Sequence, residues 1–271
     1  MITLNCFTNG FAGERCTVPG KLAEQVNWTY YEPVWSGITI FEGAHITKVN
    51  ECDSRFKVAW LCEGRCLRPE QYAAIQLIEA QFDRIITHDT RLAAMNPHKY
   101  RLMPRIGCRI PREHWGGDRY KPNKVVICVG KKCQTEGHRL RHAIASRFGG
   151  RTDIFYDYDR VEILGSYQYA IVVEACREGV MFSEHLLDTL AMGCRPIYYG
   201  THQVGLYLKY NPVIPFDNFE DLAVILATLP ARSAQTNGMN AARLAELAQY
   251  EIPEDWMVRN VLVDYVKELQ P

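Results

Sequence analysis

Short runs of consecutive apolar residues constrain the fold of this chain more than any other feature. The run Ala-Ile-Val-Val at 170–173 has no polar face, and such a strand is typical of a parallel sheet covered by helices on both sides. In the window that it opens, we expect a strand over 169–174, a helix over 184–192 and a strand over 196–199. Ser183 is a natural N-cap for that helix. The window predicts one complete βαβ unit.

The same alternation of strands and helices runs along most of the chain. Apolar residues in the segment 69–82 fall at near-helical spacing with a proline at the start, and the segment 137–148 shows a similar spacing. An amphipathic helix is expected over 254–269. The remaining expected elements are strands over 2–7, 38–41, 57–61, 84–87, 100–103, 125–129 and 153–156.

A polar segment over 111–124 separates two such α/β halves. It holds two prolines and two glycines and shows no hydrophobic period, which is typical of a linker. We therefore expect two Rossmann-like domains that face each other across a cleft. The first covers 1–115, a linker follows at 116–124, and the second covers 125–271 with the C-terminal helix.

The charge balance narrows the classes of partner. Thirty-one basic and thirty-one acidic residues leave no net charge, so neither a nucleic acid nor an anionic membrane is an expected partner. The apolar fraction of 47% excludes a disordered chain. No stretch approaches the roughly 18 apolar residues of a membrane span, and the N-terminus lacks the pattern of an export signal. The expectation is a soluble, cytoplasmic protein.

Ten cysteines raise two alternatives to free thiols. A disulfide framework belongs to short secreted chains, whereas most of the cysteines here lie within apolar runs. A zinc site needs matched pairs of ligands. The pairs Cys62 with Cys66 and Cys128 with Cys133 have no matching second pair and no helical histidine pair. We therefore expect reduced, mostly buried thiols and no metal site.

The loop after the 169–174 strand is the expected ligand site. Ligands of α/β units bind beyond the carboxyl ends of the strands, and the free amides of Glu184 and His185, with the helix dipole, favour a phosphate. Glu174 and Glu184 border the same place, where carboxylates suit the hydroxyls of ribose or a sugar. The combination indicates a sugar nucleotide. In the structural alternative, Glu184 complements the helix dipole and Glu174 caps a strand in solvent.

Three segments of this window resemble a known donor-site signature. They are Glu174-Ala175, then Phe-Ser-Glu-His-Leu-Leu-Asp at 182–188, then Gly-Cys-Arg-Pro-Ile-Tyr-Tyr-Gly at 193–200. They resemble the Phe-Glu-Asn, Tyr-Val-Thr-Glu-Lys and Pro-Ile-Tyr-Trp-Gly segments of the family-10 glycosyltransferases, the α-1,3/1,4-fucosyltransferases. The resemblance, to the soluble bacterial or viral type, implies a GT-B fold, a nucleotide-sugar donor bound mainly by the C-terminal domain, inversion at the anomeric carbon and chemistry without a metal.

Basic residues follow the 125–129 strand. Lys131, Lys132, Arg139 and Arg141 cluster there, where a diphosphate needs positive charge; solvated surface charge is the alternative for the two lysines. The segment 125–148 also looks like the family's first donor-domain strand and helix. That resemblance implies that an arginine near the helix start contacts the diphosphate, with Arg141 as the best match and Arg139 as the second.

A second resemblance lies in the first half of the chain. Residues 59–65 read Ala-Trp-Leu-Cys-Glu-Gly-Arg and are followed by matching segments at 82–87 and 100–104; they are similar to the acceptor domain of the bacterial members. The resemblance implies that Glu63, at the end of a strand, is the general base. An inverting transferase needs one carboxylate to take the proton of the acceptor hydroxyl. The alternative is a surface ion pair of Glu63 with Arg65 or Arg68.

The chain departs from the signature at two positions. His185 stands in place of the lysine and Ala175 in place of the asparagine, and a neutral histidine is a weaker ligand for a diphosphate. Arg177 is the candidate to supply the missing charge. Residues 1–56 lie outside the resemblance. Their aromatic side chains either stack on a sugar or belong to the core: Trp28, Tyr30, Tyr31 and Trp35.

Together the patterns predict an inverting glycosyltransferase that moves a sugar, fucose from GDP-fucose first, to a hydroxyl of a glycan or glycoconjugate. The expected base is Glu63, and the expected donor-binding residues are Arg141, Glu174, Glu184, His185, Arg139 and Arg177. One alternative is the same fold with another donor such as a UDP-sugar. The other is a nucleotide-sugar-binding protein without turnover. No cofactor, metal ion or integral membrane segment is expected.

Overall fold

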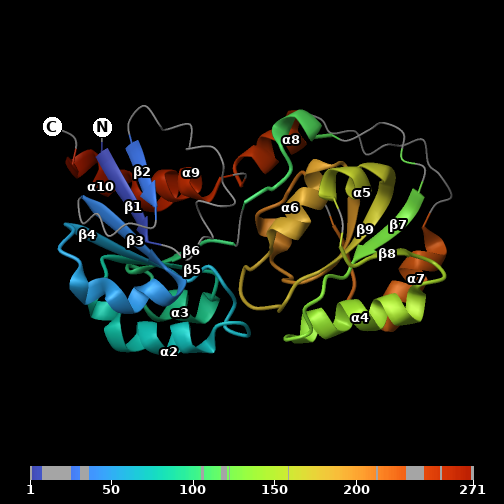
Figure 1. Ribbon diagram of the computed structural model, residues 1–271, viewed down its shortest axis with the longest axis horizontal. Helices are drawn as coiled ribbons and strands as arrows, with labels where there is room; N and C mark the ends of the chain where they lie inside the picture. Colours follow the sequence, from blue (N-terminus) through green and yellow to red (C-terminus); the bar gives the residue numbers. More distant parts are fainter. Residues whose placement is uncertain are drawn as a thin grey trace. The chain divides into compact units, whose positions relative to one another are not determined.

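The computed structural model (Figure 1) describes residues 2–7, 26–30, 37–104, 107–116, 121, 123–157, 159–211, 213–229, 241–250 and 252–269. The chain forms two compact units. Unit 1 comprises Met1–Gly107, Glu178–Met181 and Ile252–Pro271, and unit 2 comprises Cys108–Arg177 and Phe182–Glu251. The two expected α/β domains are present. The division differs from the expected one because it follows Gly107 rather than 116–124 and because the C-terminal segment belongs to unit 1.

Unit 1 is built on a parallel sheet with the strand order β2-β1-β3-β4-β5-β6. Apart from β2, the strands lie where the apolar runs predict them. The order reverses at β1, as it does in Rossmann-like sheets. The strands are β1 (Ile2–Phe7), β2 (Val26–Tyr30), β3 (Ile38–Glu42), β4 (Phe56–Trp60), β5 (Arg84–Thr87) and β6 (Tyr100–Leu102).

One face of this sheet is covered by helices from the first half of the chain (Figure 1). They are η1 (Gly43–Glu51), α2 (Pro69–Ile78), η2 (Glu79–Gln81) and α3 (Thr90–Met95). Phe41 and Ile85 of the sheet share a buried core with Tyr72 of α2. Asp89 fixes the start of α3, because its carboxylate accepts hydrogen bonds from two amides of the first turn.

The C-terminal helices cover the other face of the unit 1 sheet (Figure 1). They are α9 (Pro253–Met257), the π-helical turn η5 (Val258–Leu262) and α10 (Val263–Leu269). Tyr265 stacks on Phe56 of β4 with ring centroids 4.2 Å apart. The Tyr30 hydroxyl of β2 donates to the Glu254 carboxylate at 2.9 Å. The amphipathic segment expected over 254–269 is therefore helical, and its apolar face packs on unit 1.

Unit 2 is built on a second parallel sheet, with the order β11-β10-β9-β7-β8. Its strands are β7 (Asn123–Cys128), β8 (Asp153–Phe155), β9 (Tyr167–Val173), β10 (Arg195–Tyr199) and β11 (Ile214–Pro215). Its helices are η3 (Arg112–His114), α4 (Glu136–Phe148), α5 (Arg160–Ser166), α6 (Glu184–Ala191), η4 (Val204–Leu206), α7 (Phe219–Thr228) and α8 (Ala241–Ala248). The predicted βαβ unit is confirmed as β9-α6-β10.

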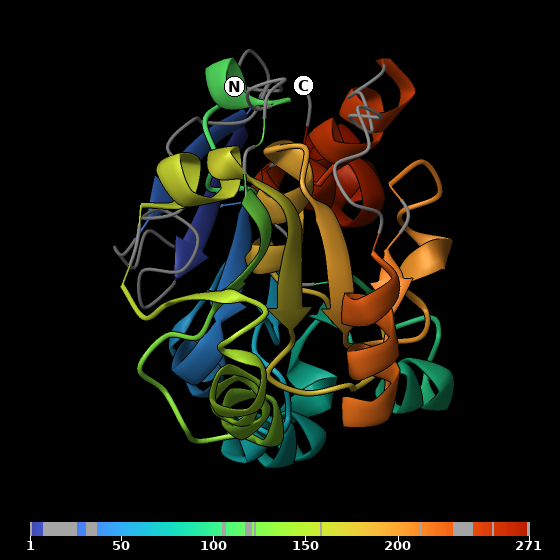
Figure 2. The ribbon, with the colours of Figure 1, turned by 90° about the vertical axis from the view of Figure 1, so that its right-hand side faces the viewer.

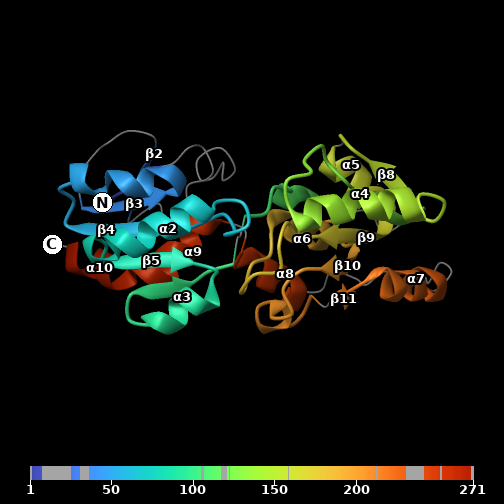
Figure 3. The same ribbon diagram turned by 90° about the horizontal axis from the view of Figure 1, so that it is seen from below.

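Helices lie on both faces of the unit 2 sheet (Figure 2). Figure 3 looks onto the face that carries α4 and α7, where Ile127 and Ile171 of the sheet share a buried core with Ile144 and Leu222 of those helices. Helices α5 and α6 cover the opposite face (Figure 1). The run at 170–173 is buried at every position, as its lack of a polar face predicts.

The described residues also answer two expectations from composition. None of their helices is long and apolar enough to cross a membrane. Their cysteines are free thiols, of which Cys6, Cys52, Cys62 and Cys194 are buried and the others are half-buried or exposed. The expectation that most thiols are buried is therefore wrong. In the same residues, no three His, Cys, Asp or Glu side chains gather as metal ligands would.

Candidate functional site

The candidate site of unit 2 lies at the carboxyl ends of β7 and β9, between which the strand order reverses. Helix α4 begins there. Thr135 and His138 form a capping box, with the His138 amide 3.2 Å from the Thr135 hydroxyl and the Thr135 amide 3.4 Å from the His138 ring. Burial first, and then Arg141, Lys132 and His142, lower the pKa of His138 to about 4. The ring is therefore neutral and able to accept.

Gly137 sets how closely α4 approaches the end of β9. A Cβ at this position would lie 1.8 Å from the carbonyl oxygen of Glu174, a distance that no packed side chain can adopt. The Gly137 amide faces the carbonyl oxygen of Ala175 at 3.3 Å. Because Gly137 has no side chain, the first turn of α4 can pack directly against the backbone that follows β9.

Glu174 is a buried link between β9 and α6. It is 1% exposed, and its carboxylate accepts a hydrogen bond from the Ser183 amide at 2.9 Å. Burial raises the pKa of Glu174. Gly200 closes the other side, because a Cβ there would lie 2.7 Å from Glu174 Cγ. Glu174 is thus enclosed by protein, and the alternative in which it caps a strand in solvent is wrong.

Two backbone amides at the start of α6, those of Ser183 and His185, are bonded to protein atoms. Ser183 is the N-cap, as predicted, and its hydroxyl accepts a hydrogen bond from the His185 amide at 3.3 Å. The Ser183 amide is taken by Glu174. The expectation that the His185 amide is free for a phosphate is therefore wrong, because the N-cap that identifies the helix start also occupies that amide.

The buried face of α6 carries two acids four residues apart, Glu184 and Asp188. Glu184 is 6% exposed and Asp188 is 0% exposed. Arg109 donates to both: its guanidinium lies 2.8 Å from Glu184 Oε1 and its amide 2.7 Å from Asp188 Oδ1. Arg160 of α5 forms an ion pair with Asp188. Each buried acid thus has a basic partner, as burial of a charge requires.

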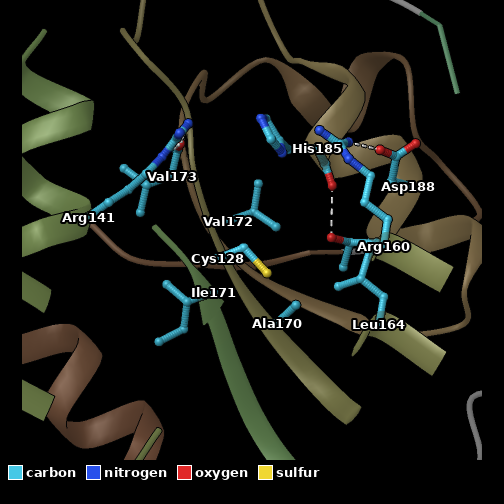
Figure 4. Close-up of a pocket in the computed structure, with 11 residues that line it drawn as sticks. Cys128, Arg141, Arg160, Leu164, Ala170, Ile171, Val172, Val173, His185 and Asp188 are labelled. Atoms are coloured by element: carbon cyan, nitrogen blue, oxygen red, sulfur yellow. Dashed lines mark hydrogen bonds and ion pairs between the residues drawn. The ribbon is translucent and has the colours of Figure 1, made fainter. Parts of the chain in front are cut away.

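Arg141 and His185 line one small cavity under α6, together with Arg160 (Figure 4). Arg141 donates from Nε to the carbonyl oxygen of Val173 at 2.8 Å, so its guanidinium lies at the carboxyl end of β9. Burial lowers the pKa of His185 well below its usual range, Glu184 opposes this, and three arginines add to it. The cavity holds about 20 Å³, room for one water molecule.

The other basic residues of the prediction lie elsewhere. Arg139 is exposed, with Nη1 3.4 Å from the carbonyl oxygen of Gln134. Lys131 pairs with Asp157 at 3.3 Å, and both side chains are exposed, which supports surface charge for this lysine. Arg177 donates from Nε to the carbonyl oxygen of Gly200 at 3.0 Å. It lines a second pocket that shares no lining residue with the first.

Glu63 of unit 1 lies in the turn that follows β4 and is half-buried. The hydroxyl of Tyr72 donates to the Glu63 carbonyl oxygen at 2.9 Å and lies 3.1 Å from His88 Nε2. Burial raises the pKa of Tyr72, so the phenol stays protonated and can donate. The turn is therefore fixed from beneath by a buried tyrosine and a buried histidine.

The two arginines named as ion-pair alternatives for Glu63 have other acidic partners. Arg65 lies 2.8 Å from Asp89, whose pKa is lowered by this arginine and by the α3 amides against the effect of burial. The Arg65 amide donates to the Glu178 carboxylate at 3.1 Å. Arg68 lies 4.0 Å from Glu70.

The N-terminal aromatic residues are described in part. Trp28 and Tyr30 of β2 are half-buried, with stacked rings whose centroids lie 6.1 Å apart. The Tyr30 hydroxyl is held by Glu254, which assigns this side chain to the packing of unit 1. The other two residues named from the sequence, Tyr31 and Trp35, lie outside the described residues.

Three solved structures of glycosyltransferases resemble this chain in fold. An α1,3-fucosyltransferase has a TM-score of 0.59 at 12% identity, over 99% of this chain and 91% of that chain. The same enzyme type with GDP-fucose has a TM-score of 0.56 at 11% identity, over 100% and 91%. An α-glucosyltransferase with UDP and a mismatched 13-mer DNA has a TM-score of 0.55 at 10% identity, over 98% and 100%.

No family model and no curated protein sequence matches the chain. At such low identities the structural likeness shows the fold alone, which is of the GT-B class with two Rossmann-like sheets. The expected α/β fold with two Rossmann-like sheets is therefore confirmed for the part of the chain that the structure describes.

Proposed function

We propose that this protein is a glycosyltransferase that uses a nucleotide-sugar donor. The observation that carries the proposal is the combination of two parallel Rossmann-like sheets with basic side chains at the point where the second sheet reverses its order. Ligands of open α/β sheets bind at such a point. The likeness to fucosyl- and glucosyltransferase structures over nearly the full chain supports it.

In the proposed donor site, Arg141 and His185 contact the diphosphate from the edge of the small cavity, since the cavity itself has room for only one water molecule. Arg141 already lies at the carboxyl end of β9, where it is oriented by a backbone carbonyl. His185 is neutral, so it contributes a hydrogen bond rather than a charge. Arg109 and Arg160, each held by an acid of α6, add positive charge beside them. Glu184 then orients Arg109, and Glu174 holds the loop between β9 and α6.

The proposed reaction is inverting, and Glu63 is its base. Its carboxylate takes the proton of the acceptor hydroxyl while the acceptor oxygen bonds to the anomeric carbon. The bond from that carbon to the diphosphate breaks, and the diphosphate leaves with the electron pair. We propose that arginines rather than a metal ion balance the leaving charge, so chelation with EDTA is expected to leave turnover unchanged.

Fucose carried by GDP remains the first choice of donor, on the strength of the segments at 174–200. A UDP-sugar is the alternative within the same fold, since one structural neighbour holds UDP. A binding protein without turnover is the second alternative, and it is favoured by the neutral imidazole of His185 where the signature has a lysine.

Calorimetry with GDP-fucose, GDP, UDP-glucose and UDP tests the donor. Arg141→Ala is expected to weaken the tightest of these ligands at least tenfold, because a hydrogen bond to a charged group is lost. Arg147→Ala, at the other end of the same helix and exposed, is the matched control and should change the affinity by less than about threefold.

Three outcomes decide among the alternatives. Absence of nucleotide binding at millimolar concentration contradicts the proposal as a whole. Tighter binding of UDP-glucose than of GDP-fucose replaces the donor but keeps the transferase. Tight binding with neither transfer to a glycan panel nor hydrolysis of the donor favours the binding protein.

A further inference from the structure

Unit 2 contains a second, larger pocket outside the cavity at Arg141. It lies beyond the carboxyl end of β10 and beside the short edge strand β11, and its volume is about 390 Å³. Volumes of this size are typical of sites for small molecules. Its lining residues come from 198–217, together with Arg177. None of them lines the cavity at Arg141.

Residues 207–211, on one side of this pocket, are hydrogen-bonded to α8 and to Tyr250 just after it. The Glu246 carboxylate accepts hydrogen bonds from the amide of Lys209 at 2.7 Å and from the Asn211 side chain at 2.8 Å. Arg243 donates to the Asn211 side-chain oxygen at 3.1 Å. The Tyr250 hydroxyl donates to the carbonyl oxygen of Tyr207 at 3.0 Å. The loop 204–211 is therefore preorganised, which lowers the entropy cost of binding.

The inner lining of the pocket is apolar. Val204, Leu208 and Phe216 line it and are themselves buried, at 7%, 3% and 3% exposure. Tyr198 adds an aromatic ring on the β10 side, where Gly200 leaves room by lacking a side chain. This lining favours an apolar or aromatic group of a ligand, because such a group leaves water on binding.

The rim of the pocket is cationic. Arg177 is held in place by the Gly200 carbonyl oxygen, by the Tyr199 ring 4.6 Å below it and by Asp217 at 2.5 Å. Lys209 and His202 are exposed on the same rim. Among the lining residues, the cations Arg177 and Lys209 outnumber the single carboxylate of Asp217. The remaining positive charge favours an anionic head group at the mouth.

We propose that this pocket binds a small organic anion, with an apolar or aromatic body against Phe216 and Leu208 and a phosphate or carboxylate at Arg177 and Lys209. The pocket shares no lining residue with the cavity at Arg141, although Arg177, Tyr198 and Gly200 come from the window that resembles the donor signature. It therefore gives the protein room for a second ligand, either a small acidic effector or an acidic group of the acceptor.

Calorimetry of the full chain with phenyl phosphate tests the proposal. Phenyl phosphate is expected to bind at least tenfold more tightly than inorganic phosphate or phenol, and benzoate in a parallel titration separates a carboxylate from a phosphate head group. Equal affinity for phenol and phenyl phosphate would show that the pocket does not recognise the anionic group. Equal affinity for inorganic phosphate would remove the apolar body.

Two variants locate the ligand. Gly205 lines the pocket, and a Cβ added to it meets no atom within 4 Å, so Gly205→Leu should fold and weaken phenyl phosphate at least tenfold. Gly150→Leu is the matched control, since Gly150 is equally open and lies outside the pocket. Lys209→Ala should weaken binding about threefold, as for an exposed charge. Unchanged affinity in both pocket variants would place the ligand elsewhere.

A competition experiment separates this inference from the proposed function. Phenyl phosphate is expected to bind with the same affinity in the presence of saturating GDP or UDP. Displacement by the nucleotide would overturn the inference, because the pocket would then be part of the donor site. If no nucleotide binds at all, the proposed function fails while the phenyl phosphate result stands on its own.

Discussion

The turn at Glu63 in unit 1 and the start of α6 in unit 2 use acidic side chains in opposite ways. Glu63 is half-buried, and the groups that fix its turn lie beneath its backbone. Glu174, Glu184 and Asp188 are almost fully buried and bonded to protein groups. A buried, bonded carboxylate loses its partners if it turns to a ligand. The α6 acids therefore serve to hold basic groups and the loop, whereas the half-buried position of Glu63 is compatible with the base that we propose.

The largest expected effect is on turnover, from Glu63→Gln. The amide keeps the shape of the carboxylate but cannot take a proton, so transfer from the preferred nucleotide sugar should fall by about 10²–10⁴. Donor affinity and the melting temperature should stay unchanged. Glu70→Gln, on the exposed surface of α2, is the control. Full turnover in Glu63→Gln would mean that the base lies elsewhere.

The next effect is on stability, from Asp188→Ala. This change leaves Arg160 without its ion-pair partner and the Arg109 amide without its acceptor, and we expect a loss of about 3–5 kcal/mol in the free energy of unfolding. Asp157→Ala removes the exposed pair with Lys131 and should cost less than about 1 kcal/mol. Equal losses in urea unfolding would contradict the distinction between a buried and a surface acid.

A third prediction concerns acid stability at the start of α4. Because the pKa of His138 is lowered to about 4, the folded chain binds this proton less readily than the unfolded chain. The neutral form of His138 therefore stabilises the folded chain. This contribution to the free energy of unfolding is complete above the ordinary histidine pKa of 6.5 and is lost as the pH falls towards 4. The loss amounts to at most about 3 kcal/mol.

His138→Gln tests this assignment, because glutamine at the same position of a capping box accepts the same hydrogen bond without titrating. Urea unfolding between pH 7 and pH 4 should lose less stability in this variant than in the parent chain. His142→Gln, one turn further along α4, is the control and should follow the parent. A parent curve that is flat over this range would show that His138 is not held neutral by burial.

The sheets could be predicted from the sequence, since strands buried on both faces need apolar residues at every position. The run at 170–173 shows this. Strand β2 gave no such run. The amphipathic stripe over 254–269 predicted a helix, yet a stripe does not specify its partner, and the helix packs on Phe56 of unit 1. Because the stripe does not show that this helix returns to unit 1, the assignment of the C-terminal segment to unit 1 could not be predicted either.

The candidate site could be predicted in part. The N-cap Ser183 follows from a local pattern, whereas the sequence placed Arg141 after the strand at 125–129 and did not show its contact with the end of β9. The partners of α6 do not, because Arg109 lies 75 residues from Glu184 and Arg160 lies 28 residues from Asp188. One signal was present: two acids four residues apart on an otherwise apolar helix need buried basic partners.

The smallest predicted effect probes the support beneath Glu63. Tyr72→Phe removes the hydrogen bond to the Glu63 carbonyl oxygen and the contact with His88, at a cost of about 1 kcal/mol. Tyr100→Phe is matched to it, since Tyr100 is also buried in unit 1 and donates to Glu79 at 3.1 Å. Both variants should lose similar stability in urea unfolding.

Only Tyr72→Phe should also lower kcat, by severalfold and with the KM for the donor unchanged, because it alone loosens the turn that carries the base. A parallel loss of kcat in Tyr100→Phe would trace the effect to the general stability of unit 1. Unchanged kcat in both would show that the half-buried position of Glu63, rather than the groups beneath it, is what distinguishes this acid from those of α6.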